Sequence, residues 1–182
     1  MRAFLFHILL LVCLAVYSRA VDVERLLGTL TLQEKIGQMT QIDIAVFFDA
    51  GLQAINYDKL REWINTYKIG SVLNSIHSGG QVKGSAGWTP SDWRYFINKM
   101  QQFTQETESK IPIIYGVDTI HGGTYIYGSA LFPQALSVAA TYNPALAYTA
   151  GAISSKDTRA AGIPWYEINS CHKFIVLVAI TV

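Results

Sequence analysis

The sequence predicts an α/β fold in which helices pack around a parallel sheet. Short apolar runs that are typical of buried strands alternate along the chain with segments of helical periodicity. Neither an internal repeat nor a low-complexity linker interrupts this alternation. A repeated order of strand, loop and helix is typical of parallel sheets whose helices lie outside them.

The first third of the chain predicts three helices around an extended stretch. Residues 22–30 form a short amphipathic helix. Thr31 and Glu34 have the spacing of a capping box, which begins a second helix that runs through Gln38. The apolar residues within 42–48 predict an extended stretch. Residues 58–68 place four large side chains at helical spacing: Leu60, Trp63, Ile64 and Tyr67.

The middle and the end of the chain predict three strands and two long helices. The strands are expected at residues 69–73, 111–117 and 163–166, and a glycine-rich loop follows the first of them at 78–87. Thr89 and Pro90 open a helix to about residue 108, because proline favours the first helical position. Asn143 and Pro144 open another helix to about residue 161, where Gly162 is suited to end it.

Residues 1–20 have the composition of a secretory signal peptide. Arg2 supplies the positive start, residues 4–16 are nearly all apolar, and Ser18 and Ala20 put small residues at the cleavage positions. The apolar run is shorter than the about 20 residues of a membrane span. We therefore expect cleavage after Ala20 and a secreted, extracellular protein with no membrane attachment. The alternative is an uncleaved segment that anchors a membrane-associated chain.

Charge and cysteine content argue against a nucleic-acid-binding protein and against an internal disulfide. Cleavage would remove Arg2 and Arg19 and leave 12 Lys and Arg against 13 Asp and Glu, which changes the net charge from +1 to −1. No basic patch or stripe indicates a nucleic-acid partner. With Cys13 in the signal segment, Cys171 stands alone and has no internal disulfide partner.

Asp118 is the main candidate for a site residue. It follows the apolar run of residues 111–117, at the end of a predicted strand. Parallel α/β enzymes build their sites at the carboxyl ends of strands, and burying an acid there costs several kcal/mol unless it is hydrogen-bonded. The functional interpretation is a carboxylate that accepts hydrogen bonds from sugar hydroxyls. The structural interpretation is an acid that caps the next loop or pairs with His121.

The other polar candidates have competing interpretations. Arg159 is either a donor that reaches into a binding site or a cation favoured by the dipole at the end of its helix. His121 lacks the spaced partners of a zinc site, so we expect no metal and regard it as a packed or hydrogen-bonded loop residue. The glycines within 78–87 form no P-loop, and no Gly-x-Ser-x-Gly elbow occurs.

One acid and the tryptophans complete the set of candidates. Glu167 also follows an apolar segment, so that Asp118 and Glu167 could form the carboxylate pair of a glycosidase. The residues after Glu167 instead break the pattern of strand and loop. Trp88 and Trp165 are the better candidates for stacking on sugar rings, whereas Trp63 and Trp93 fall on helices and are expected in the core.

Three ordered blocks resemble the amino-terminal domain of glycoside hydrolase family 3, the family of β-glucosidases and exo-glucanases. They are residues 116–122 (GVDTIHG), 127–133 (YGSALFP) and 159–163 (RAAGI), and residues 30–39 (LTLQEKIGQM) resemble the opening helix of the family. The resemblance covers residues 22–166. It implies a (β/α)₈ TIM-type barrel, no metal or organic cofactor, and a β-glucoside or β-glucan oligosaccharide as the substrate.

The resemblance also implies roles for individual residues. Asp118 matches a family carboxylate that binds hydroxyls of the reacting sugar, and Arg159 matches an arginine that lines the same pocket. The family reaction retains the sugar configuration through a covalent glycosyl-enzyme, with an Asp nucleophile and a Glu acid/base. Neither has a counterpart in this chain, because both lie later in the family sequence.

The chain is therefore expected to hold only the first part of the barrel. A complete barrel needs typically about 250 residues, and residues 167–182 match nothing in the family and end in an apolar tail. We expect a signal peptide at 1–20, a partial barrel domain at 21–166 and a non-matching tail at 167–182. The expected function is that of a β-glucosidase-type hydrolase present as an inactive fragment. The alternative is a non-catalytic sugar-binding or decoy fragment.

Overall fold

The computed structural model describes residues 22–49, 54–74, 81–82, 85–86 and 88–167. The predicted signal peptide, Cys171 and the apolar tail lie outside the described residues, as do the glycines of the loop at 78–87. Within the described part of the chain, no helix has both the length and the apolar character needed to cross a membrane.

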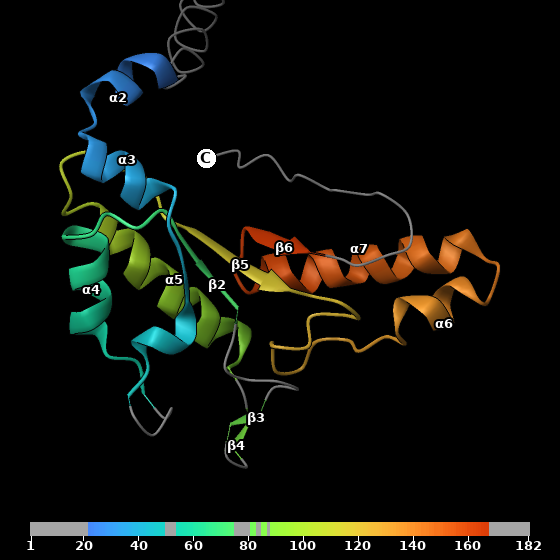
Figure 1. The fold of residues 1–182 in the computed structure, drawn as a ribbon. Coiled ribbons are helices and arrows are strands. Elements are labelled where there is room, and N and C mark those ends of the chain that lie inside the picture. The colour runs from blue at the N-terminus through green and yellow to red at the C-terminus, as the bar shows by residue number, and fades with distance from the viewer. Residues whose placement is uncertain (1–21, 50–53, 75–80, 83–84, 87, 168–182) are drawn as a thin grey trace, which may run out of the picture.

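A parallel sheet of four strands lies at the centre of the molecule (Figure 1). Its order is β1 (Gln41–Asp43), β2 (Ser71–Leu73), β5 (Ile114–Asp118) and β6 (Trp165–Glu167), and every neighbouring pair is parallel. The short strands β3 (Gln81–Val82) and β4 (Ser85–Ala86) form a separate antiparallel pair. The predicted parallel sheet is thus confirmed.

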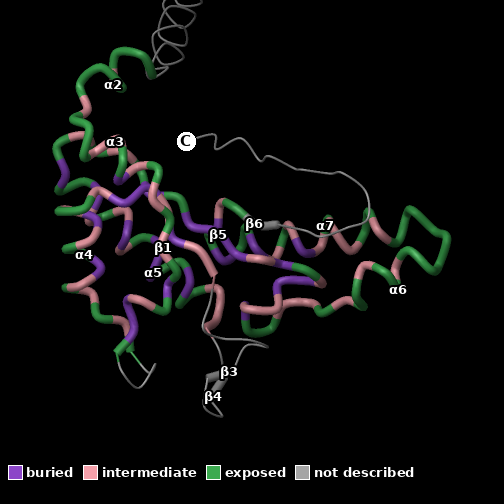
Figure 2. Tube along the Cα trace, in the orientation of Figure 1, coloured by how far each residue is buried: buried purple, intermediate pink, exposed green. Residues whose placement is uncertain are grey.

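Two helices cover one face of the sheet. They are α4 (Tyr57–Asn65) and α5 (Pro90–Thr104), which pack against each other and on the buried side chains of Val72, Tyr115 and Val117. Figure 2 shows the buried residues gathered around β5 and these helices. Apolar burial of this kind contributes about 1.5–3 kcal/mol for each large side chain.

The predicted helix starts are confirmed at the level of single hydrogen bonds. Thr31 and Glu34 form the capping box of α3 (Leu32–Gln38), which follows α2 (Val23–Thr29). Thr89 forms a second box with Asp92 at the start of α5. The side chain of Asn143 caps α7 (Pro144–Ala160), and Gly162 follows that helix with a φ of +77°. Each such cap stabilises its helix by about 1 kcal/mol.

The structure also differs from the sequence-based elements. The strands β3 and β4 lie within the predicted loop at 78–87, β5 begins at Ile114 and α5 ends at Thr104. Residues 42–48 are not one extended stretch, because β1 ends at Asp43 and a 3₁₀ helix, η1 (Ile44–Phe47), follows. The Asp43 carboxylate accepts a hydrogen bond from the Ala45 N–H at 2.8 Å, which turns the chain there. The short helix α6 (Ala135–Ala139) was not predicted.

Candidate sugar-binding site

The last residue of β5 carries a carboxylate whose inner oxygen is unsatisfied. Asp118 is half-buried, and its Oδ1 is buried without a hydrogen-bond partner. No hydrogen bond or ion pair joins Asp118 to His121 among the residues that the structure describes, so the alternative of a structural pair between them is not found. A buried carboxylate oxygen is costly unless it accepts a hydrogen bond. The position is therefore suited to accepting one from a ligand.

Backbone hydrogen bonds and a close backbone approach hold the loop after Asp118. The Tyr127 N–H donates to the Trp88 carbonyl at 2.9 Å, and the Phe132 N–H donates to the His121 carbonyl at 2.8 Å. Gly122 has a φ of +113°, and a side chain there would bring its Cβ to 2.2 Å from the Ala130 carbonyl oxygen. These contacts fix the backbone that follows Asp118.

His121 lies on this loop and is half-buried. Its Nδ1 is buried and has no hydrogen-bond partner within the described part of the chain, so of the two expected forms, packed or hydrogen-bonded, that atom shows only packing. No group of three or more His, Cys, Asp or Glu side chains in the described residues could hold a metal ion. His121 Nδ1 and Asp118 Oδ1 are thus two unsatisfied polar atoms on one segment.

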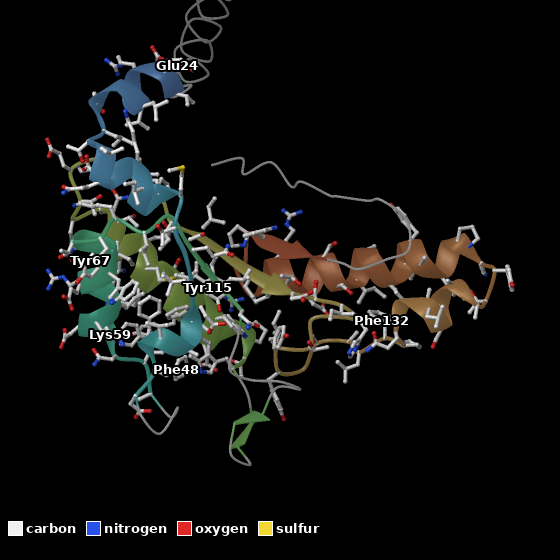
Figure 3. The ribbon with its side chains drawn as sticks, in the orientation of Figure 1. Glu24, Phe48, Lys59, Tyr67, Tyr115 and Phe132 are labelled. Atoms are coloured by element: carbon white, nitrogen blue, oxygen red, sulfur yellow. The ribbon has the colours of Figure 1, made fainter. Side chains whose placement is uncertain are left out.

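A polar network that the sequence analysis missed ties three strands together at their carboxyl ends. The Tyr115 hydroxyl donates to the Asn74 carbonyl, and the Asn74 amide donates from Nδ2 to Asp43 Oδ2 at 3.1 Å. Burial, with a smaller contribution from Asp43, raises the pKa of Tyr115 well above its usual value. Figure 3 shows Tyr115 in the centre of the molecule. Asn74 directly follows an apolar strand, so the rule that selected Asp118 could also have found Asn74.

Tyr125 is a second residue that the sequence analysis missed. It is half-buried, and its carbonyl oxygen accepts a hydrogen bond from Trp93 Nε1 at 3.1 Å. Burial raises the pKa of the Tyr125 phenol, and the negative charge of Asp118 raises it further. The Tyr125 phenol is therefore close enough to the Asp118 carboxylate for the charge of Asp118 to affect it.

The structure places Arg159 at the other end of the sheet from Asp118. Arg159 is exposed in the last turn of α7, just before the amino end of β6, whereas Asp118 stands at the carboxyl end of β5. Since β5 and β6 are parallel, the amino end of β6 and the carboxyl end of β5 lie at opposite ends of the strands. The position fits a cation at a helix carboxyl terminus, which the helix dipole favours.

Glu167 is placed by the strand register. As the last residue of β6 it pairs directly with Asp118 of β5, although the sequence analysis placed a break in the pattern after it. Neighbouring strands are about 4.8 Å apart, so the two backbone positions are close.

Three of the tryptophans contact other aromatic rings, and the fourth, Trp165, is partly exposed on β6. Trp93 is buried and Trp63 packs edge-on against Phe47 and Tyr67, in agreement with the prediction for both. Trp88 stacks on Phe48 and contacts the rings of Trp93 and Phe96, so it is part of an aromatic cluster. Trp165 is 39% exposed.

Comparison with known proteins identifies the family. Residues 31–166 match the model of the glycosyl hydrolase family 3 N-terminal domain. The chain belongs to glycosyl hydrolase family 3. The predicted resemblance is confirmed, and the parallel sheet is part of the barrel domain of family 3.

Two relatives show how much of a family 3 protein the chain represents. It is 42% identical over 149 residues to the lysosomal beta glucosidase of Dictyostelium discoideum, which covers 81% of this chain and 18% of that protein. Its fold is similar to that of the exo-1,3/1,4-beta-glucanase ExoP from a Pseudoalteromonas species, with a TM-score of 0.61 and 24% identity. That likeness covers 80% of this chain and 22% of ExoP, so the chain spans about a fifth of either relative.

Proposed function

We propose that this chain supplies one wall of the sugar-binding site of a β-glucosidase-type hydrolase. Asp118 is the residue that carries the proposal, because its Oδ1 is buried, unsatisfied and located at the carboxyl end of a parallel strand. A hydroxyl of a terminal β-linked glucoside or β-glucan would donate to this oxygen. The name of the 42% identical relative, a beta glucosidase, supports this substrate class.

The proposed wall binds sugar but does not by itself cleave the glycosidic bond. Retaining glycosidases need a nucleophilic carboxylate and a second carboxyl group that acts as acid and base, about 5–5.5 Å apart. In the family, both groups come from segments with no counterpart in these 182 residues. We therefore expect the 182-residue polypeptide to bind a β-glucoside without hydrolysing it.

The experiment measures the affinity of the 182-residue polypeptide for methyl β-glucoside by calorimetry, together with the release of nitrophenol from an aryl β-glucoside. Asp118→Asn is expected to weaken binding about tenfold or more, because a hydrogen bond to a charged acceptor is lost. Asp58→Asn is the matched control, since it makes the same change of charge at an exposed position of α4. Equal affinities of the two variants would contradict the proposal.

Two further variants resolve the remaining assignments. Arg159 is assigned to the site by the family resemblance alone. Because it lies at the opposite end of the parallel strands from Asp118, Arg159→Met is expected to leave the affinity unchanged, and a loss of affinity would support the family role. Turnover of the aryl glucoside that is lost in Glu167→Gln would instead indicate that Glu167 and Asp118 act as the catalytic pair.

We also propose that the protein enters the secretory pathway through residues 1–20. Amino-terminal sequencing of the protein recovered from the medium is expected to begin at Val21. Recovery of the intact amino terminus in a membrane fraction would support the anchored alternative.

A further inference from the structure

Four residues form a continuous row across the face of the sheet opposite α4 and α5. The strand registers pair Asp43 with Leu73, Leu73 with Gly116, and Gly116 with Trp165. Residues in register on parallel strands point to the same face, and Asp118 is on that face too, two residues further along β5. The row therefore lies just below the carboxylate of the proposed site.

Gly116 allows the ring of Trp165 to lie over the sheet. A Cβ at position 116 would stand 2.7 Å from Trp165 Cε3 and 2.9 Å from Leu73 Cδ1, which is closer than real contacts allow. The side chains of Trp165 and Leu73 thus occupy the space that a side chain at 116 would need. Together they cover the middle of the row with apolar surface.

Trp165 differs from the other tryptophans in its surroundings. Trp63, Trp88 and Trp93 each contact other aromatic rings. No aromatic ring of the described residues packs against Trp165, which is 39% exposed. Ile114, on the same face of β5 two residues before Gly116, is 45% exposed. An apolar ring below an unsatisfied carboxylate matches the two surfaces of a pyranose, which has an apolar C–H face and a polar hydroxyl edge.

We propose that the indole ring of Trp165 forms the floor of the sugar site and stacks on the C–H face of the β-glucoside whose hydroxyls bind Asp118. This inference rests on the proposed function and adds a second contact to it. Trp165 lies about 8 Å from Asp118 along the diagonal between neighbouring strands, from the spacings of about 4.8 Å across and 3.3 Å along a sheet. A ligand resting on the ring can therefore reach the carboxylate.

The test follows methyl β-glucoside bound to the 182-residue polypeptide by proton NMR and by tryptophan fluorescence. Stacking predicts that the ring current of Trp165 shifts the protons of one sugar face upfield in the unmodified protein. Trp165→Leu is expected to abolish this shift and to weaken binding about tenfold. Trp165→Phe is expected to remove the change in fluorescence that the sugar causes. Trp63→Phe, on the helical side of the sheet, should retain both the signal and the affinity.

The outcomes separate this inference from the proposed function. Suppose that binding depends on Asp118 but the sugar protons show no upfield shift and Trp165→Leu keeps full affinity. This result would refute the stacking role of Trp165 and leave the proposed function standing. Absence of any binding to the unmodified chain would overturn both. The upfield shift is measured on the unmodified protein, so the test stands even if Trp165→Leu fails to fold.

Discussion

Arg94 binds the carboxyl end of α7 by donating a hydrogen bond from Nη1 to the carbonyl oxygen of Ala160. Its Nη2 donates to Ser91 Oγ at 3.2 Å, so that the guanidinium joins the start of α5 to the end of α7. A cation in this position is favoured by the helix dipole. The contact fixes the turn from which β6 and Trp165 begin.

Gly162 is expected to be necessary for this turn. Its φ is +77°, and an added Cβ would lie 3.1 Å from Arg94 Cγ. Gly162→Ala should lower the free energy of unfolding by about 1–2 kcal/mol, because a left-handed conformation is unfavourable for alanine. Gly151→Ala, inside α7 with open space around it, is the control and should stabilise by up to about 1 kcal/mol. Urea denaturation measures both, and equal effects would refute the explanation.

Asp157 is expected to hold the loop that follows Asp118. Its Oδ2 accepts a hydrogen bond from the Ala130 N–H at 3.1 Å. Asp157→Ala leaves that N–H without its partner and should cost about 1–3 kcal/mol, whereas Asp157→Asn keeps an acceptor and should cost less. Hydrogen exchange of the Ala130 amide reports the bond directly. Unchanged protection in Asp157→Ala would show that the loop does not depend on it.

The pH dependence of stability should include a contribution from Glu106. Hydrogen bonds from Arg61 Nε and Asn65 Nδ2, each 2.7 Å, hold the pKa of this carboxyl group below its usual value, with Arg61 as the larger cause. Because the pKa is lower in the folded state, the stabilisation is present above the unfolded-state pKa. It is lost as the pH falls through the folded-state pKa.

Glu106→Gln should therefore reduce the loss of stability on acidification. Glu108→Gln removes a nearby exposed acid for which no ion pair occurs among the described residues, and it serves as the control. Urea denaturation at a series of acidic pH values provides the comparison. Parallel curves for Glu106→Gln and the unmodified chain would contradict the assignment.

Local signals in the sequence predicted the parts of the fold that depend on neighbouring residues. Thr31 caps its helix as predicted, and Thr89 and Asn143 cap the two helices whose starts were predicted at these positions. A side chain and a backbone N–H two or three residues apart suffice to make such a cap. The helix α6 carried no such signal, since Gln134 makes no capping hydrogen bond and none of the residues of α6 is buried. The turn at Asp43 was missed because the apolar residues after it also fit a strand.

The candidate site depended more on tertiary structure. Asp118 was found because a single acid follows an apolar strand. The separation of Arg159 from Asp118 depends on which end of β6 the helix α7 approaches, and no local pattern contains that information. The different surroundings of Trp88 and Trp165 likewise follow from contacts between distant segments, with Trp88 against Phe48 and Trp165 over Gly116.

The most direct test of the sugar-binding wall is to map methyl β-glucoside onto the ¹⁵N-labelled polypeptide by amide chemical shifts. The proposed site predicts concentration-dependent shifts centred on residues 117–123 and around Trp165, which are lost in Asp118→Asn and kept in Asp58→Asn. Shifts confined to helices α2 to α4, or shifts that persist in Asp118→Asn, would contradict a sugar site at the carboxyl end of β5.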